Sequence, residues 1–138
     1  MADRVFIIEN IDGLRTLTAY HGHHGTVVIP DGTEAIGMYV FRRCFSIEEL
    51  VLPGSVRVIG AEAFNGCISL KKIHFSEGLS QIGHRAFWCC SALSEVTFPR
   101  SLIRIGSRSF ESCSMLRTVH FRNEAVQTDE YAFNSTAL

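Results

Sequence analysis

The sequence predicts a β-rich α/β fold, in which a right-handed solenoid carries a parallel sheet on one face and short strands and helical turns on the other. The first supporting observation is Phe-x-x-Cys, which recurs in steps of 23 residues at Phe41, Phe64, Phe87 and Phe110. The second is a short segment of alternating apolar and polar residues at the same interval, the period of a half-buried strand. Because a fixed repeat of about 20–50 residues is typical of solenoids, this pattern decides the fold class.

Residues 1–25 precede the first repeat and are expected to form an N-terminal cap segment, with a hairpin around Asp12-Gly13. His21, His23 and His24 follow and could supply two or three nitrogens to a metal. No cysteine or acidic residue stands beside them at metal-site spacing, so we interpret the cluster as a polar lead-in turn. The sequence therefore indicates no metal and no cofactor.

Residues 26–138 are expected to form five repeats of 23 residues, the last of them incomplete. Each repeat begins with a strand, and Pro30, Pro53 and Pro99 end their strands because proline cannot donate to a ladder. The strands recur with the same polarity, so we expect one parallel sheet with one rung per repeat. The clearest strand segments are Leu50 to Leu52, Ile73 to Phe75, Val96 to Phe98 and Val119 to Phe121.

An Ile-Gly pair follows each of the first four strands, as in Ile59-Gly60, and predicts a second short extended segment. The glycine there indicates either a positive φ or a close approach of two backbones. A corner then leads to the next coil, and its phenylalanine rings should form one continuous interior spine. One coil alone buries too little apolar surface to be stable, so neighbouring coils must supply each other's core.

The repeat can be compared with a known pattern. The consensus Leu-x-x-Ile-x-Leu-Pro-x-Ser-Val-x-x-Ile-Gly-x-x-Ala-Phe-x-x-Cys resembles the bacterial BspA-like, or treponemal-type, leucine-rich repeat, and the segment Asp12 to Gly22 is similar to the lead-in of that family. The resemblance implies a leucine-rich-repeat solenoid without a catalytic motif, and a role in adhesion or host contact at the cell surface. The second row carries the pattern at Ile47, Leu50, Leu52, Pro53, Ser55, Val56, Ile59, Gly60, Ala63, Phe64 and Cys67.

Charge and hydropathy narrow the possible partners and the location. The net charge is −1, with 13 basic and 14 acidic residues, so no general field attracts nucleic acid. No apolar stretch has the length of a membrane span. The start carries only four consecutive apolar residues, Val5 to Ile8, which is too short for a secretion signal. This favours a cytoplasmic protein or a trimmed form of an exported one, whereas the resemblance implies a surface or secreted protein.

The cysteine column is expected to fill space, because a free thiol packs as a small hydrophobic group. In-register rungs leave the Cβ atoms slightly too far apart for disulfides, and a straight ladder does not converge into a tetrahedral zinc site. Cys89 stands outside the column. The column itself consists of Cys44, Cys67, Cys90 and Cys113.

Two outward columns on the strands are candidates for a partner-binding face, since solenoids present extended sheets to their partners. The structural alternative is a charge ladder of Glu49, Lys72 and Glu95 that fixes the strand register. The candidate residues on this face are Glu49, Val51, Lys72, His74, Glu95, Thr97, Thr118 and His120.

A second candidate surface contains Trp88, the only tryptophan, with Arg85 and Arg108 beside it. An exposed tryptophan flanked by arginines is typical of interface hot spots. The alternative is a ring folded over the corner phenylalanine.

These observations predict a non-enzymatic, adhesin-like module that binds an unidentified protein or glycan. The alternative function is structural, because the last coil has no following strand and an open solenoid end is an unpaired edge. The chain would then form homo-oligomers through its C-terminal edge, unless a C-terminal segment has been trimmed.

Overall fold

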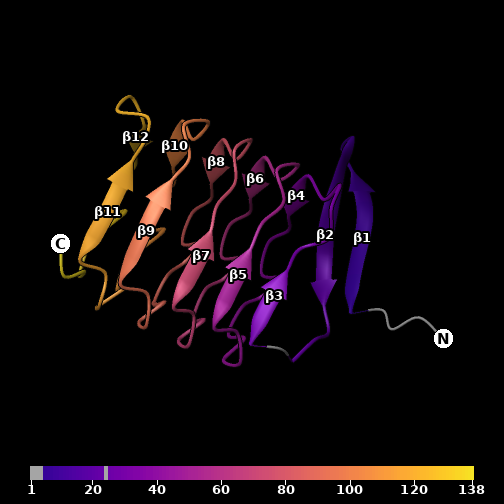
Figure 1. Cartoon of the computed structure of the whole chain (residues 1–138), viewed down its shortest axis with the longest axis horizontal. Helices are drawn as coiled ribbons and strands as arrows, with labels where there is room; N and C mark the ends of the chain where they lie inside the picture. Colours follow the sequence, from indigo (N-terminus) through magenta and orange to yellow (C-terminus); the bar gives the residue numbers. More distant parts are fainter. Residues whose placement is uncertain (1–4, 24) are drawn as a thin grey trace.

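The structure is a computed structural model that describes residues 5–23 and 25–138, and in these residues it contains twelve strands and no helix. Strands of a front row alternate along the chain with strands of a back row, and a hairpin lies at the N-terminal end (Figure 1). The strands are β1 (Phe6–Ile11), β2 (Leu14–Tyr20), β3 (Thr26–Val28), β4 (Ala35–Ile36), β5 (Glu49–Val51), β6 (Val58–Ile59), β7 (Lys72–His74), β8 (Gln81–Ile82), β9 (Glu95–Phe98), β10 (Arg104–Ile105), β11 (Thr118–Phe121) and β12 (Gln127–Thr128).

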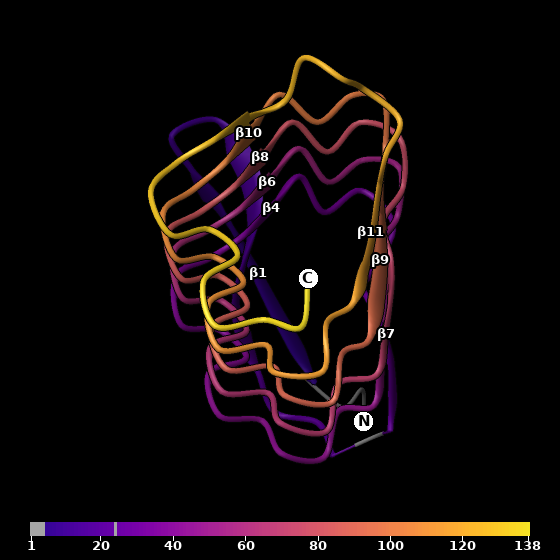
Figure 2. The same ribbon diagram turned by 90° about the vertical axis from the view of Figure 1, so that its left-hand side faces the viewer.

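The back row is one continuous seven-stranded sheet in the order β1-β2-β4-β6-β8-β10-β12. The hairpin expected around Asp12-Gly13 is present: β1 and β2 are antiparallel, and the two turn residues have φ angles of 51° and 85°. Strand β2 then pairs in parallel with β4, so the hairpin covers the first coil. A view along the stack shows the successive coils superposed, with the back strands on one side and β7, β9 and β11 on the other (Figure 2).

The front row differs from the single sheet that the repeat predicted. It is divided into a three-stranded sheet, β3-β5-β7, and a two-stranded sheet, β9-β11. Within each sheet the strands are parallel and in register, with steps of 23 residues such as Glu49↔Lys72 and Glu95↔Thr118. The interval is therefore retained across the front face, but the ladder is interrupted between β7 and β9.

The helical turns predicted for the other side of the coil are wrong, because the described residues contain no helix there. The coil bends instead at two left-handed residues per repeat, four positions apart, such as Glu62 (φ 55°) and Gly66 (φ 78°). A left-handed residue cannot continue a right-handed helix, so only three residues remain between the two bends. These residues form isolated turns, in which Asn65 N–H donates to Glu62 O at 3.3 Å.

The interior spine is present. Phe41, Phe64, Phe87 and Phe110 are fully buried, and their ring centroids are 4.8, 5.0 and 5.1 Å apart along the stack. Phe133 continues the series at 5.4 Å from Phe110. Backbone bonds at the same corner hold the coils together, since Phe64 N–H donates to Ala86 O at 2.7 Å. The rings and the backbone thus repeat at the spacing of neighbouring strands, about 4.8 Å.

The glycines after the back strands allow close approach of neighbouring coils. A Cβ atom on Gly83 would lie 2.7 Å from Ala61 N and 2.8 Å from Gly60 C, which are both backbone atoms that cannot move aside. The φ angles of these glycines are not positive, so the close approach explains their recurrence and the left-handed alternative does not. Any side chain at these positions would force the coils apart.

Candidate functional site

The outward columns predicted from the sequence lie on the front face. Strand pairing places Glu49 beside Lys72 and Val51 beside His74 in one sheet. In the other sheet, Thr118 lies beside Glu95 and His120 beside Thr97. All eight residues are exposed or half-buried. The period-two alternation therefore assigned the correct side of each strand.

The backbone ladder opens between β7 and β9. At the start of the other front rungs, one carbonyl oxygen accepts two N–H groups from the next coil: Glu48 O accepts from Lys71 N at 2.8 Å and from Lys72 N at 3.3 Å. Ser94 O, two repeats after Glu48, likewise accepts two N–H groups from the coil that follows it. Lys71 O occupies the equivalent position on the third coil, and among the described residues it has no such backbone bond to the fourth coil.

The opening is confined to the front of the coil. On the back, Ser80 O accepts from Ile103 N at 2.9 Å and from Arg104 N at 3.3 Å, so coils three and four are joined there as elsewhere. At the corner, Phe87 N–H donates to Ser109 O at 2.7 Å. The same two coils are therefore held together along two sides and separated along the third.

Two inward-facing residues at this opening are partly exposed, one within β7 and one directly after it. Ile73 and Phe75 are half-buried, whereas the equivalent residues of the next coil, Val96 and Phe98, are 1% and 0% exposed. The Phe75 ring still stacks on Phe98, with 5.6 Å between centroids. Apolar surface thus lies within reach of solvent between the two strands.

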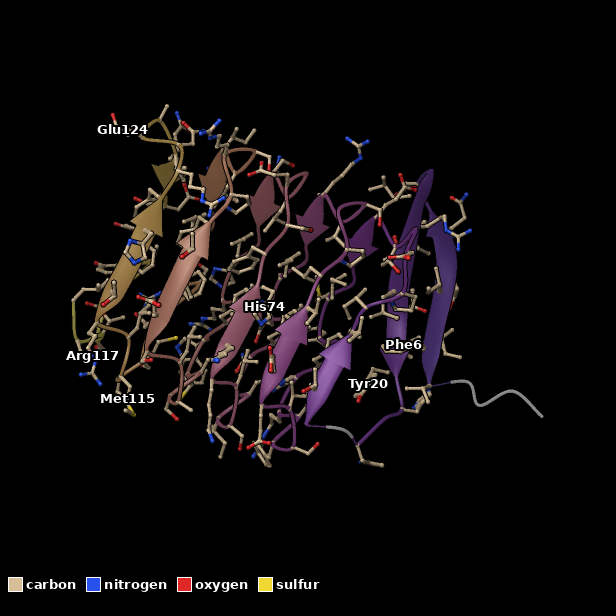
Figure 3. All side chains as sticks on the ribbon, in the orientation of Figure 1. Phe6, Tyr20, His74, Met115, Arg117 and Glu124 are labelled. Carbon is tan, nitrogen blue, oxygen red and sulfur yellow. The ribbon has the colours of Figure 1, made fainter. Side chains whose placement is uncertain are left out.

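A groove of about 780 Å³ lies over this opening. Four of the residues predicted for the binding face line it together, while the other four flank it on β5 and β11. Figure 3 shows His74 on the front face and Met115 and Arg117 at the base of β11. The groove is lined by Lys71, Lys72, Ile73, His74, Phe75, Glu77, Ala92, Ser94, Glu95, Thr97, Pro99, Met115, Arg117 and Arg122.

Sequence reasoning missed Arg117, Arg122 and Met115, which lie just before and after β11. The alternation placed Ile73 and Phe75 on the inward side of their predicted strand. One sequence difference coincides with the interrupted rung: Ser76 stands where the first, second and fourth repeats have proline. The period alone treats every rung as equivalent and therefore cannot indicate an interrupted one.

The predicted charge ladder takes a different form. Glu49 pairs with His74, and Glu95 Oε2 lies 3.3 Å from His120 Nε2, so each carboxylate reaches diagonally to the third residue of the next strand. Residues in diagonal positions on neighbouring strands are close enough for a long side chain such as glutamate to reach the histidine. Each pair lies within its own sheet, Glu49–His74 between β5 and β7 and Glu95–His120 between β9 and β11. Lys72, the predicted middle of the ladder, projects from β7 and lines the groove.

The Trp88 surface lies apart from this groove, at the corner of the coil. The indole N–H of Trp88 donates to Glu111 Oε1 at 3.1 Å, and the Arg108 guanidinium contacts both oxygens of Glu111 at 3.0 and 2.8 Å. Trp88 and Arg108 are therefore held by a residue that the sequence did not single out. Arg85 lines a neighbouring hollow with Trp88 and Arg42.

Glu111 is 8% exposed, and its ionisation depends on these partners. Burial alone raises the pKa of this carboxyl group, but hydrogen bonds from Arg108, Trp88 and Asn134, with the Arg108 charge, bring the pKa below its usual value. The corner is thus a bonded network as well as a surface.

The cysteine column consists of free thiols, and Cys67, Cys90 and Cys113 are fully buried. Each donates from Sγ to the carbonyl oxygen of a phenylalanine 26 residues earlier, for example Cys113 to Phe87 O at 3.1 Å. Burial raises the pKa of Cys67 to about 12, and burial also raises the pKa of Cys90 well above its usual range. Cys44 and Cys89 are half-buried.

The histidine cluster is only partly described, since His24 lies outside the described residues. His21 and His23 are exposed and line a small hollow with Tyr20 and Arg43. In the described part of the chain, no group of three or more histidine, cysteine or acidic side chains is arranged to hold a metal ion. The same residues include no helix long and apolar enough to cross a membrane.

Stacked 23-residue coils with parallel strands, a phenylalanine spine and a buried cysteine column define a leucine-rich-repeat solenoid. The chain belongs to the BspA type: residues 27–138 match the family described as "BspA type Leucine rich repeat region", in six copies. Among curated proteins, no sequence matches the chain.

Solved structures with the same fold come from several bacteria. The leucine-rich repeat protein of T. pallidum (TpLRR) is 34% identical, with a TM-score of 0.88 over 97% of this chain and 66% of that one. A leucine-rich repeat protein from Bacteroides capillosus is 27% identical, with a TM-score of 0.76 over 88% of this chain and 97% of that one. A leucine-rich cell surface protein from Faecalibacterium prausnitzii is 24% identical, with a TM-score of 0.70 over 100% of this chain and 46% of that one. The chain therefore spans slightly less than two thirds of the first of these proteins and less than half of the last.

Proposed function

We propose that this chain is a non-enzymatic protein-interaction module that binds its partner on the front face, with the groove between β7 and β9 at the centre of the contact. The observation that carries the proposal is the interrupted ladder, because it places apolar surface and backbone polar groups beside charged side chains. Interfaces combine these features, with an apolar centre and a polar rim. The repeat scaffold supports the proposal, since stacked coils present a broad and rigid sheet.

We further propose that the protein acts at the bacterial surface, in an adhesin-like role. Support comes from the description of the F. prausnitzii neighbour as a cell surface protein. A cytoplasmic location, which the N-terminal sequence had favoured, receives no support from the comparisons. Fractionation of the native cells, followed by protease treatment of intact cells, tests this location. Protection of the protein from external protease would contradict it.

Site-specific photo-crosslinking tests the binding face. A photoreactive residue is placed at Thr97 or Val51 on the front face, and at Gln81 on the back face as a matched control. After incubation with surface extracts of the organism and of its host, adducts of discrete mass are expected only from the front positions. A glycan partner would give adducts sensitive to glycosidase. Equal labelling from the back face, or no adduct from any position, would contradict the proposal.

A second candidate function is end-to-end association. Strands β11 and β12 are edge strands of their sheets in the part of the chain that the structure describes, and Phe121 is 40% exposed beside this edge. An unpaired edge is a template for pairing with another chain. Sedimentation over a hundredfold range of concentration tests the association. A variant with Val119→Pro, which removes a backbone donor from β11, should then remain monomeric, and a wild-type protein that is monomeric throughout would exclude this function.

A further inference from the structure

We infer that the occupant of the groove is an acidic peptide segment in extended conformation, with one apolar side chain inserted between β7 and β9. This inference rests on the proposed function and adds the chemistry of the partner. It is carried by the distribution of charge along the groove and by the opening in its floor.

The acidic groups of the groove are already bonded within the chain. Glu95 is paired with His120, and Glu77 Oε1 accepts the backbone N–H of Arg100 at 3.3 Å. These are the two carboxylates that line the groove. Each of these carboxylates therefore already has one partner within the chain.

Most of the basic side chains that line the groove make no ion pair in the described part of the chain. Lys71 Nζ lies 3.6 Å from Glu48, and both side chains are more than half exposed, so this pair is weak. Among residues 5–23 and 25–138, the ion pairs within 4.0 Å do not include Lys72, Arg117 or Arg122. Four cationic side chains and two carboxylates give the lining a formal charge of +2, in a protein whose net charge is −1. The groove is thus a local basic site that fits an acidic ligand.

The floor of the groove favours a peptide over a simple anion. Ile73 and Phe75 are half-buried, and Met115 is 48% exposed at one end, so an apolar group gains contact there. Lys71 O and the N–H groups of Ser94 and Glu95 occupy the positions that pair in the other front rungs. An extended peptide offers acidic side chains, an apolar side chain and both backbone donors and acceptors, whereas a phosphate or a sulfated sugar lacks the apolar group.

Binding of defined peptides tests this inference. The probes are fluorescein-labelled twelve-residue peptides with six acidic residues and a central leucine, the same peptide with glycine for leucine, and the same peptide with lysine for every acidic residue. We expect the acidic leucine peptide to bind at least tenfold more tightly than either of the others. Its affinity should also fall as salt rises, because the contacts are between exposed charges. Equal binding of the lysine peptide, or of the glycine peptide, would overturn the inference.

Matched variants locate the site. Lys72→Glu and Arg117→Glu should each weaken the acidic leucine peptide at least fivefold and leave the melting temperature unchanged, because both side chains are exposed. Arg57→Glu is the control, since Arg57 is exposed beside β6 in the back sheet. If the control weakens binding as much as the groove variants do, the peptide binds elsewhere and the inference is wrong.

Amide chemical shifts provide a measurement that needs no variant. Addition of the acidic leucine peptide should shift the amides of Ser94, Glu95 and Phe75 and leave those of Gln81 and Arg104 in place. Shifts confined to the back sheet would overturn the inference. The two proposals are separable: front-face crosslinks to a partner without any acidic-peptide binding would retain the proposed function and remove this inference alone.

Discussion

The Cys67 thiol donates a hydrogen bond to the carbonyl oxygen of Phe41, with 3.1 Å between Sγ and O. The same oxygen accepts the backbone N–H of Cys44 at 3.1 Å. The thiol of one coil therefore satisfies a carbonyl group at the corner of the coil before it, and the arrangement recurs between Cys90 and Phe64 at 3.3 Å. The cysteine column packs as small apolar groups and also bonds neighbouring coils.

Alkaline pH should destabilise the protein through these thiols. The pKa of Cys67 is about 12 in the native state against a usual 9.0, so the native state holds this proton more tightly than the unfolded chain. The resulting stability is fully present below pH 9 and is lost as pH rises from 9 toward 12, by about 1.4 kcal/mol per pH unit. Urea unfolding at pH 7, 9 and 10 under reducing conditions measures this slope. Cys67→Ala should reduce the slope, and identical slopes for the variant and the wild type would contradict the assignment.

The close approach of coils at Gly83 predicts a large effect from a single methyl group. Gly83→Ala places Cβ less than 3.0 Å from three backbone atoms and should lower the free energy of unfolding by more than about 2 kcal/mol. Gly54→Ala is the control, because its added Cβ would meet only Glu77 O, at 3.6 Å. Thermal and urea unfolding of both variants compare them. Similar losses at the two glycines would show that the coils are not in close contact at Gly83.

Acid should weaken the Trp88 corner through Glu111. The pKa of Glu111 is lower in the native state than the usual 4.5, so its stabilising effect is present above pH 4.5 and is lost as pH falls through the native pKa. Glu111→Gln should cost about 1–3 kcal/mol at pH 7, since it removes charge-assisted hydrogen bonds. The variant should also lose less stability than the wild type between pH 5 and pH 3. Glu124→Gln, at an exposed position, serves as the control and should follow the wild type.

The left-handed bends predict a stabilising substitution. Cys89 has a φ of 62° at the position where the preceding repeat has Gly66, with a φ of 78°. Cys89→Gly removes the steric cost of a side chain there, which exceeds the added entropy of glycine, so the free energy of unfolding should rise by up to about 1 kcal/mol. Ala61→Gly, at a position without a positive φ, should lower it. Equilibrium unfolding in urea measures both, and a loss of stability in the Cys89 variant would contradict the strain argument.

Much of the candidate site could be predicted from the sequence, but its centre could not. Alternation placed Lys72, His74, Glu95 and Thr97 on one outward face, because every second residue of a strand points away from the core. The contributions of Arg117 and Met115 depend on how the turn before β11 folds over the groove. The charge ladder predicted a contact between Glu49 and Lys72, because the period places them side by side on neighbouring strands. In the structure Glu49 instead contacts His74 diagonally.

The sequence by itself determined the stack of coils, the inward and outward sides of each strand and the phenylalanine spine. These features repeat, and each coil needs an apolar side at the same positions because only its neighbours can cover it. The tertiary structure alone decided that the ladder opens between β7 and β9, that Glu111 holds Trp88 and Arg108, and that the coil corners are left-handed turns without helices. Such features depend on the contacts between two particular coils, and a period shared by all coils carries no information about any one junction.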